Sequence, residues 1–154
     1  MKIVTERLDI VPCTNDSLQI LDSQNYDNGP EIENYLKALA DDPDLLSWGH
    51  WLVVLKTDGR IIGDAGFKGK PNANKEVEIG YGLLEPYWNK GYATETVAGF
   101  IHWAFETGEV EKVLAETESD NIGSIRVLEK AGMQKTEETD AMIYWEIKKG
   151  SNKI

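Results

Sequence analysis

The sequence is poor in the residues that form cross-links and metal sites. Its 154 residues include one cysteine, Cys13, and two histidines, His50 and His102. A single thiol forms no internal disulfide, and so few ligands, this far apart, predict no zinc cluster. We therefore expect no bound metal, and we expect Cys13 to be a buried or half-buried residue near the end of a strand.

Long apolar runs are also absent. No stretch approaches the roughly 20 apolar residues that cross a bilayer, and the first residues lack a basic region followed by an apolar run. The sequence thus predicts a cytoplasmic protein with no membrane partner. With 41% hydrophobic residues the chain can bury one core. We expect a single domain over residues 1–154, as a monomer or a homodimer.

Positive charge is scarce. Sixteen Lys and Arg residues stand against 27 Asp and Glu residues, which gives a formal net charge of −11. Sequence-independent binding of nucleic acid depends on neutralising phosphates with Lys and Arg, so we expect no nucleic-acid partner. The charge favours cationic partners, although it can equally serve only to keep the protein soluble.

The first half of the chain alternates between strand and helix patterns. Residues 7–11 alternate as a half-exposed strand, and Cys13 and Thr14 follow it. From Thr14 to about Ala40 the pattern is helical but broken at residues 25–30, which predicts two short helices. A hairpin over residues 51–67 with Asp58-Gly59 in its turn follows, and then a strand over residues 77–83.

The segment from Glu85 to Glu95 leads from that strand through a glycine turn into a long helix that Gly108 should end. The start of a helix leaves about four N–H groups unpaired and carries roughly half a positive charge, so it suits an anion. Gly91 has no Cβ and Ala93 is small, so a phosphate can approach the main chain closely. The segment is equally compatible with an ordinary strand-to-helix turn.

A strand over residues 112–117, a helix capped by Asp120 or Asn121 and a terminal hairpin complete the chain. Strand, glycine turn, helix and strand form a βαβ unit, whose two strands should be parallel. Combined with the antiparallel hairpins, this predicts a mixed, twisted α/β sheet with helices on its faces and a ligand at the carboxyl ends of its strands.

Three stretches together resemble one known family. They are Ile79-Gly80-Tyr81, the segment from Pro86 to Glu95, and the segment from Asn121 to Met133. In this order they resemble the GNAT superfamily of acetyl-CoA-dependent N-acetyltransferases, closest to the branch with ribosomal-protein N-terminal acetyltransferases. Thr5-Glu6-Arg7-Leu8 and the hairpin also fit that branch, so the resemblance covers nearly the whole chain.

The resemblance implies a GNAT-like fold of about six to seven strands and about four helices, with acetyl-CoA as cosubstrate. It also implies a bulge near Leu83 that splays the strands apart for the pantetheine arm, and a diphosphate held by backbone amides of about residues 88–94. Trp88 stands where the family commonly has Gln or Arg, which removes a side-chain donor. The cofactor-binding residues implied in this way are Leu83, Leu84, Trp88, Asn89, Lys90, Gly91, Tyr92, Ala93, Thr94, Asn121, Ser124, Arg126 and Lys130.

Some of these residues have a simpler explanation. Asn121 can act only as a helix cap. Arg126 and Lys130 are expected either to reach the adenosine phosphates or to form a solvated helix face. The N–H of Leu83 or Leu84 is the family-style donor to the thioester carbonyl, but a main-chain donor leaves no signature in the sequence.

Glu78 and Ser124 are the candidate catalytic residues. Glu78 matches the general base of some family members, and it can also be an exposed carboxylate or a binder of the cationic acceptor. Many relatives carry a tyrosine general acid where this sequence has Leu128, so the proton for the leaving thiolate must come from elsewhere. Ser124 can donate a hydrogen bond to the sulfur, or it can simply be exposed on the first helical turn.

Aromatic residues are candidates for the acceptor site. Trp51, Tyr81 and Tyr144 are the predicted substrate-binding residues, and each can instead be a core residue. Tyr81 should lie on the opposite face of its strand from Glu78. The resemblance therefore predicts transfer of an acetyl group from acetyl-CoA to a primary amine, a peptide N-terminus or a small molecule, by direct attack in a ternary complex. The alternative is a catalytically silent acyl-CoA-binding regulatory module.

Overall fold

The computed structural model describes residues 1–26 and 30–150, and its central feature is an eight-stranded sheet of order β1-β2-β3-β4-β5-β6-β8-β7. Only the pairing of β5 with β6 is parallel in this sheet. The strands are β1 (Ile3–Val4), β2 (Leu8–Pro12), β3 (His50–Leu55), β4 (Ile61–Phe67), β5 (Glu76–Leu83), β6 (Lys112–Glu118), β7 (Gln134–Glu138) and β8 (Met142–Lys148).

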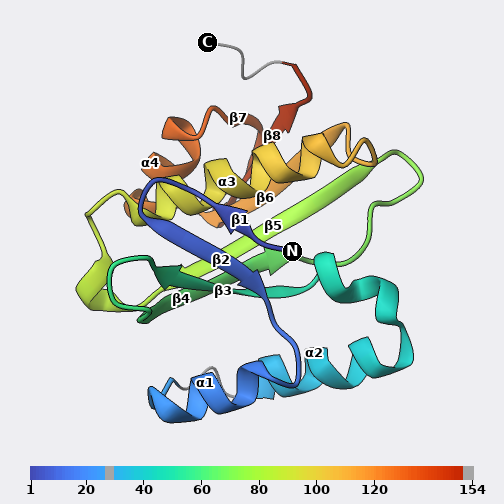
Figure 1. Cartoon of the computed structure of the whole chain (residues 1–154). Coiled ribbons are helices and arrows are strands. Elements are labelled where there is room, and N and C mark those ends of the chain that lie inside the picture. The colour runs from blue at the N-terminus through green and yellow to red at the C-terminus, as the bar shows by residue number, and fades with distance from the viewer. Residues whose placement is uncertain (27–29, 151–154) are drawn as a thin grey trace.

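Helices cover both faces of the sheet (Figure 1). On one face lie α1 (Ser17–Ser23) and α2 (Pro30–Asp41), and on the other lie α3 (Tyr92–Glu106) and α4 (Ile122–Lys130). Two short 3₁₀ helices, η1 (Pro43–Ser47) and η2 (Glu85–Tyr87), connect elements. The predicted break between the first two helices overlaps residues 27–29, which lie outside the described residues.

Strand alternation divides the core between these two faces. The larger cluster lies under α3 and includes Trp51, Val53, Phe100 and Trp145, all almost without exposed surface. The smaller cluster lies under α1 and α2 and includes Cys13, which is buried directly after β2, as the sequence predicts. Successive residues of β3 therefore pack into different clusters, Trp51 and Val53 into the larger and Leu52 into the smaller, because side chains alternate between the two faces of a strand.

The sheet has eight strands, slightly more than the six to seven expected. The additional strand is β1, which is two residues long and pairs through Ile3 with Ile10 and through Val4 with Asp9. A strand this short has no periodicity to recognise. It depends on its partner β2 and on the turn that joins them, which is a tertiary effect.

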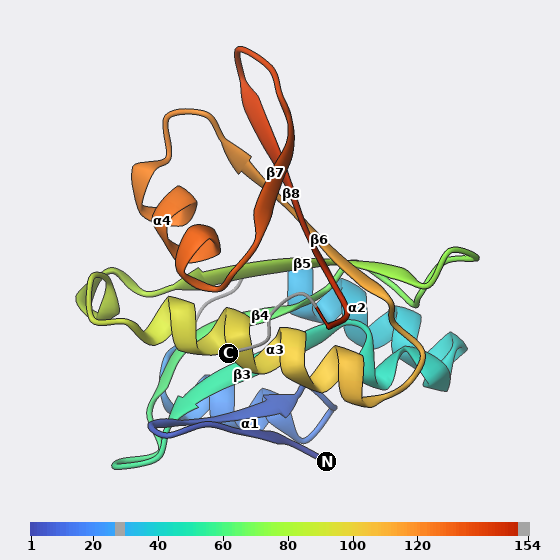
Figure 2. The same ribbon diagram turned by 90° about the horizontal axis from the view of Figure 1, so that it is seen from above.

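The parallel pairing of β5 with β6 is short. It includes Glu76 with Lys112, Val77 with Val113 and Glu78 with Leu114, and no later pair follows in either strand. Beyond Glu78 the two strands diverge toward α4 (Figure 2). The structure therefore contains a split in the middle of the sheet, which exposes backbone groups of β5.

The split does not arise from the expected bulge near Leu83. The register of β5 with β4 is regular from Ile79 to Leu83, so β5 itself is not bulged against that neighbour. The register shift of this region lies in the pairing of β3 with β4, where Val53 pairs with Gly63 and Val54 with Ile61, so that Ile62 of β4 is the extra residue. Divergence of β6 from β5, rather than an inserted residue in β5, opens the sheet.

None of the helices in the described part of the chain is long and apolar enough to cross a membrane.

Candidate active site

A cavity of about 660 Å³ opens where β5, the start of α3 and the start of α4 meet. Ten of the thirteen predicted cofactor-binding residues belong to its wall. These are Leu83, Trp88, Asn89, Gly91, Ala93, Thr94, Asn121, Ser124, Arg126 and Lys130. The three stretches that carry the family resemblance therefore converge on this cavity, although they are far apart in the sequence.

The loop before α3 has the backbone shape that close contact with an anion requires. Gly91 is the N-cap of α3 with φ of +85°, and Asn89 has φ of +61°. The first helical N–H groups, on Tyr92, Ala93 and Thr94, have no acceptor within the helix and point out of its end. The N–H of Trp88 is different, because it donates to the carbonyl of Glu85 at 3.0 Å. The Trp88 N–H is therefore already paired, and the predicted amide donors to the diphosphate are those of residues 89–94.

Arg7 attaches the first strands of the chain to this loop. Its Nε donates to Glu95 Oε1 at 2.8 Å and its Nη1 donates to the carbonyl of Lys90 at 3.0 Å. Its guanidinium lies over the ring of Tyr92, 4.2 Å from the ring centre. The Thr5 hydroxyl and the Arg7 N–H also donate to Glu95. Lys90 and Tyr92 are therefore parts of this support, and their side chains are not among those that line the cavity.

Of the two candidate thioester donors, the backbone geometry favours Leu83. The N–H of Leu84 donates to the carbonyl of Ile62 at 2.8 Å and is already paired. In an antiparallel ladder the N–H groups of successive residues point alternately toward and away from the neighbour. Leu83 lies opposite Gly63 between such bonds, so its N–H points away from β4 and into the split.

Tyr81 and Ser124 lie close together in the wall of the cavity. The Tyr81 ring packs against the larger core, while its hydroxyl is buried and has no hydrogen-bond partner among the described residues. Burial raises the pKa of Tyr81, and the nearby Ser124 hydroxyl opposes that effect only in part. Ser124 is half-buried on the first turn of α4, and its N–H donates to the Oδ1 of Asn121 at 3.1 Å. Asn121 is thus the N-cap of α4.

Glu78 lies at the apex of the split, since it is the last residue of β5 that pairs with β6. Its side chain points to the face opposite Tyr81 and is not part of the cavity wall. Glu78 Oε2 accepts from Lys68 Nζ at 2.6 Å, and 27% of its side chain is exposed. A carboxylate in this place can meet a positively charged group that approaches from the side of α1 and α2.

Two of the predicted acceptor-binding aromatics are not part of this cavity. Trp51 has no exposed surface and donates its indole N–H to the carbonyl of Ser47 at 3.1 Å, so it is a core residue rather than a substrate contact. Its indole ring packs edge-on against the ring of Phe100. Tyr144 is half-buried on β8, opposite Glu116 of β6 and Glu137 of β7.

The cavity also contains residues that the sequence did not identify. They are Gly82, Tyr87, Gly123 and Val127. Gly82 and Gly123 carry no chemical signal, and Tyr87 is placed by η2, a single turn that has no periodicity to detect. Val127 follows from the helical spacing of α4, since it lies three residues after Ser124.

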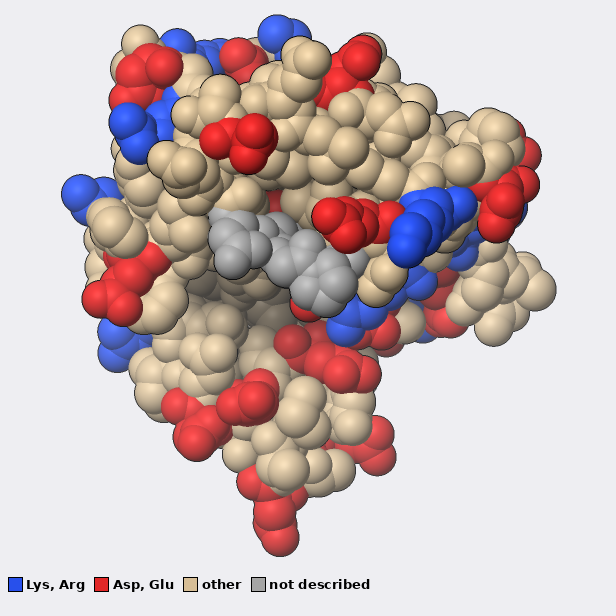
Figure 3. All heavy atoms as spheres, turned by 90° about the horizontal axis from the view of Figure 1, so that it is seen from below, with Lys and Arg blue, Asp and Glu red and all other residues tan. Residues whose placement is uncertain are grey.

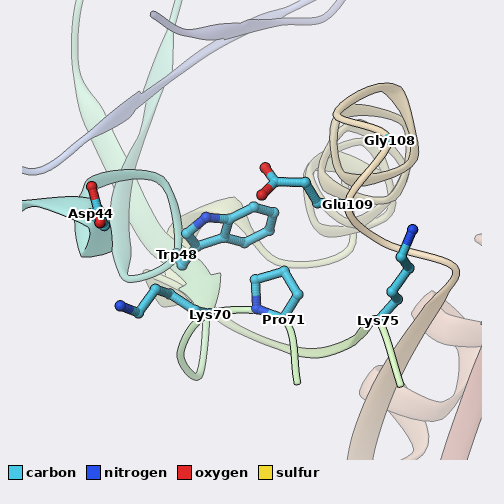
Figure 4. Close-up of a pocket in the computed structure, with 7 residues that line it drawn as sticks. All are labelled: Asp44, Trp48, Lys70, Pro71, Lys75, Gly108 and Glu109. Atoms are coloured by element: carbon cyan, nitrogen blue, oxygen red, sulfur yellow. The ribbon is translucent and has the colours of Figure 1, made fainter. Parts of the chain in front are cut away.

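A second hollow, of about 530 Å³, lies near the other end of α3 (Figure 4). Side chains of both charges surround it, among them Asp44, Lys70, Lys75 and Glu109 around the ring of Trp48. No cluster of three or more metal-ligating side chains occurs in the part of the chain that the structure describes.

A family model described as an acetyltransferase (GNAT) domain matches residues 21–134. The uncharacterized N-acetyltransferase YjdG of Bacillus subtilis is 32% identical over 108 residues, which make up 70% of this chain and 64% of that relative. The chain thus matches slightly less than two thirds of that relative's length.

Two solved structures illustrate the likeness of the fold. The ribosomal-protein-S5-alanine acetyltransferase from Vibrio fischeri superposes with a TM-score of 0.77 at 16% identity and covers 100% of both chains. The spermidine N-acetyltransferase from Vibrio cholerae, in complex with CoA and spermine, has a TM-score of 0.76 at 10% identity, covering 96% of this chain and 98% of its own. With the family model spanning most of the chain, this protein belongs to the GNAT acetyltransferase family.

Proposed function

We propose that this protein transfers an acetyl group from acetyl-CoA to a primary amine, by direct attack of the amine within a ternary complex. The observation that carries the proposal is the position of the Gly91 loop. The free N–H groups at the start of α3 open onto the same cavity as the unpaired edge of β5. A diphosphate and an extended amide-containing arm need these two features side by side.

The residues of the cavity fit the parts of coenzyme A. The amides of residues 89–94 suit the diphosphate, because they combine unpaired N–H groups with the positive end of the helix dipole. The β5 edge after Glu78 offers strand-like hydrogen bonds to the pantetheine arm. Arg126 and Lys130 are one helical turn apart on the exposed side of α4 and supply positive charge for further phosphates.

The amine is proposed to approach from the opposite face of β5. Gly80 and Gly82 leave that face of the strand without side chains, and a Cβ added at Gly82 would meet nothing within 4 Å. Glu78 and Asp64 lie on the same face. Acidic side chains are spread over the side of the molecule that carries α1 and α2, around a hollow (Figure 3). This setting suits a cationic amine, either a peptide N-terminus or a small molecule.

Glu78 is proposed to take a proton from the ammonium form of the substrate, directly or through water, so that the neutral amine can attack the thioester carbon. The Leu83 N–H is proposed to stabilise the resulting oxyanion, as preorganised main-chain donors do. A route through an acetylated cysteine is disfavoured, because Cys13 is fully buried and burial raises its pKa to about 12.

Turnover with a panel of amines tests the proposal. Acetyl-CoA is mixed with α-amino peptides, polyamines and aminoglycosides, and release of the free thiol is followed together with the mass of the product. We expect acetylation of at least one class. Tight binding of coenzyme A without any acetylated product would instead support a silent acyl-CoA-binding module. That alternative is favoured by Leu128, a fully buried apolar residue in the place of the general acid of many relatives.

A further inference from the structure

Tyr81 lines the cavity, and its hydroxyl is the one buried side-chain polar atom without a hydrogen-bond partner in the described part of the chain. It is buried and unpaired among the described residues, although its ring belongs to a well-packed wall. A buried donor without a partner destabilises the fold, and most such groups in native proteins are paired. The other buried tyrosine hydroxyls support this rule, since Tyr26 donates to Asp64 at 2.6 Å and Tyr35 donates to the carbonyl of Leu46 at 3.2 Å.

The position of this hydroxyl relates it to the site rather than to the core. Tyr81 is two residues before Leu83, whose N–H points into the split, and both residues line the cavity with Ser124. On the strand its side chain points to the face opposite Glu78. The two groups therefore flank the open edge of β5 from opposite sides, one able to accept a proton and the other able to donate one.

The neighbouring helix provides no other acid at this place. Leu128 on α4 is fully buried and apolar, and the hydroxyl that α4 does contribute, that of Ser124, lies beside Tyr81. Serine is a much weaker acid than a phenol. Tyr81 is thus the stronger proton donor of these two neighbouring hydroxyls.

Resting on the proposed function, we infer that Tyr81 is the catalytic residue that donates a proton to the departing thiolate of coenzyme A. As the carbon–sulfur bond of the tetrahedral intermediate breaks, its electron pair passes to sulfur, which takes the Tyr81 hydroxyl proton. The positively charged nitrogen of the intermediate releases its second proton to water, and the tyrosinate recovers a proton from water, so that the amide and the thiol leave uncharged. The proton that Glu78 took from the ammonium group also returns to water. Burial keeps the phenol protonated until that moment.

Tyr81→Phe tests this role, because it removes only the hydroxyl. We expect unchanged affinity for coenzyme A, a melting temperature equal to or above that of the wild type, and a kcat about 100-fold lower, within the usual range for loss of a general acid. The control is Tyr35→Phe, which removes a paired hydroxyl outside the cavity and should lower the melting temperature while leaving kcat unchanged.

A selenium analogue of the donor separates proton donation from packing. The selenolate that leaves acetyl-seleno-coenzyme A is a much weaker base than a thiolate and needs less help from an acid. The ratio of wild-type to Tyr81→Phe rates should therefore be at least about tenfold smaller with the selenoester than with the thioester. If the ratio of wild-type to Tyr81→Phe rates is the same for both acetyl donors, or if Tyr81→Phe turns over the thioester at the wild-type rate, the role of Tyr81 is refuted. The proposed function would stand in either case. A wild-type protein that acetylates no amine would refute the proposed function and this role with it.

Discussion

Gly91 combines two requirements in one residue. Its φ of +85° is the left-handed conformation that side chains disfavour, and a Cβ there would lie 3.1 Å from the guanidinium of Arg7. A larger side chain therefore strains the loop and also projects toward the position proposed for the diphosphate.

We expect Gly91→Gln to weaken coenzyme A binding at least about tenfold, or roughly 1.4 kcal/mol, as measured by titration calorimetry. Gly108→Gln is the matched control, since Gly108 follows the same helix with φ of +77° and no atom lies within 4 Å of an added Cβ. Both variants bear the backbone strain, and only the first should lose the coenzyme. Equal affinities would show that the diphosphate binds elsewhere.

Glu78 is the residue to test for proton removal. Glu78→Gln should lower kcat by about 100-fold, while the affinity for coenzyme A stays unchanged, because Glu78 is not part of the cavity wall. Glu76→Gln serves as the control, two residues earlier on the same face and paired with Lys112 at 3.5 Å. A kcat for Glu78→Gln equal to that of the wild type would remove Glu78 from the mechanism.

At the scale of elements, the contact between the first strands and α3 supports the loop. Glu95 lies in the first turn of α3 and accepts hydrogen bonds from Thr5 and Arg7, while Arg7 also holds the carbonyl of Lys90. These contacts give the Thr5-Glu6-Arg7-Leu8 stretch a structural role. It fixes the start of the helix in the shape that exposes its N–H groups.

Glu95→Gln should destabilise the protein by about 1.5–3 kcal/mol, the scale of hydrogen bonds to a charged group, and should weaken coenzyme A binding severalfold. Urea unfolding and calorimetry measure the two effects. Glu106→Gln, near the other end of α3 and 3.8 Å from His102 on the surface, should change neither. A destabilised Glu95→Gln variant with full affinity would show that the contact does not shape the loop.

The stability effect of Glu95 should also depend on pH. Burial by itself would raise the pKa of this carboxyl, but the hydrogen bonds from Thr5 and Arg7 outweigh it, so the pKa lies below its ordinary value of 4.5. A lowered pKa stabilises the fold above that ordinary value, and the contribution disappears as pH falls through the folded-state pKa. The gap between wild type and Glu95→Gln should therefore be full at pH 7 and close on acidification below about pH 4.5. A gap that persists in acid would contradict this.

At the scale of the whole molecule, the net charge of −11 acts on both proposed substrates, with opposite signs. It attracts a cationic amine and repels the anionic coenzyme, and salt screens both effects. Raising the ionic strength from about 20 to about 200 mM should lower kcat/KM for a polyamine severalfold and raise the association rate of coenzyme A. Stopped-flow and steady-state kinetics measure both. Salt independence of the polyamine reaction would show that the charge serves solubility alone.

The order of strands and helices could be predicted because each longer element carries its own period. The apolar positions of α3, the alternation of β5 and the Asp58-Gly59 turn are local signals. The assembly of the cavity wall depended on the family resemblance, which brought residues 83–94 and 121–130 together. The two-residue β1, the single turn η2 and the paired state of the Leu84 N–H have no local signal, because each depends on a distant partner.

By itself, the sequence determined which longer segments are strands and helices and where a glycine turn leads into α3, since propensity, periodicity and glycine positions are properties of neighbouring residues. Only the tertiary structure decided that Trp51 is core, that Leu83 and not Leu84 points its N–H into the split, and that the Tyr81 hydroxyl is left unpaired beside Ser124. Burial and hydrogen-bond partners depend on which distant segments meet, and packing alone determines that.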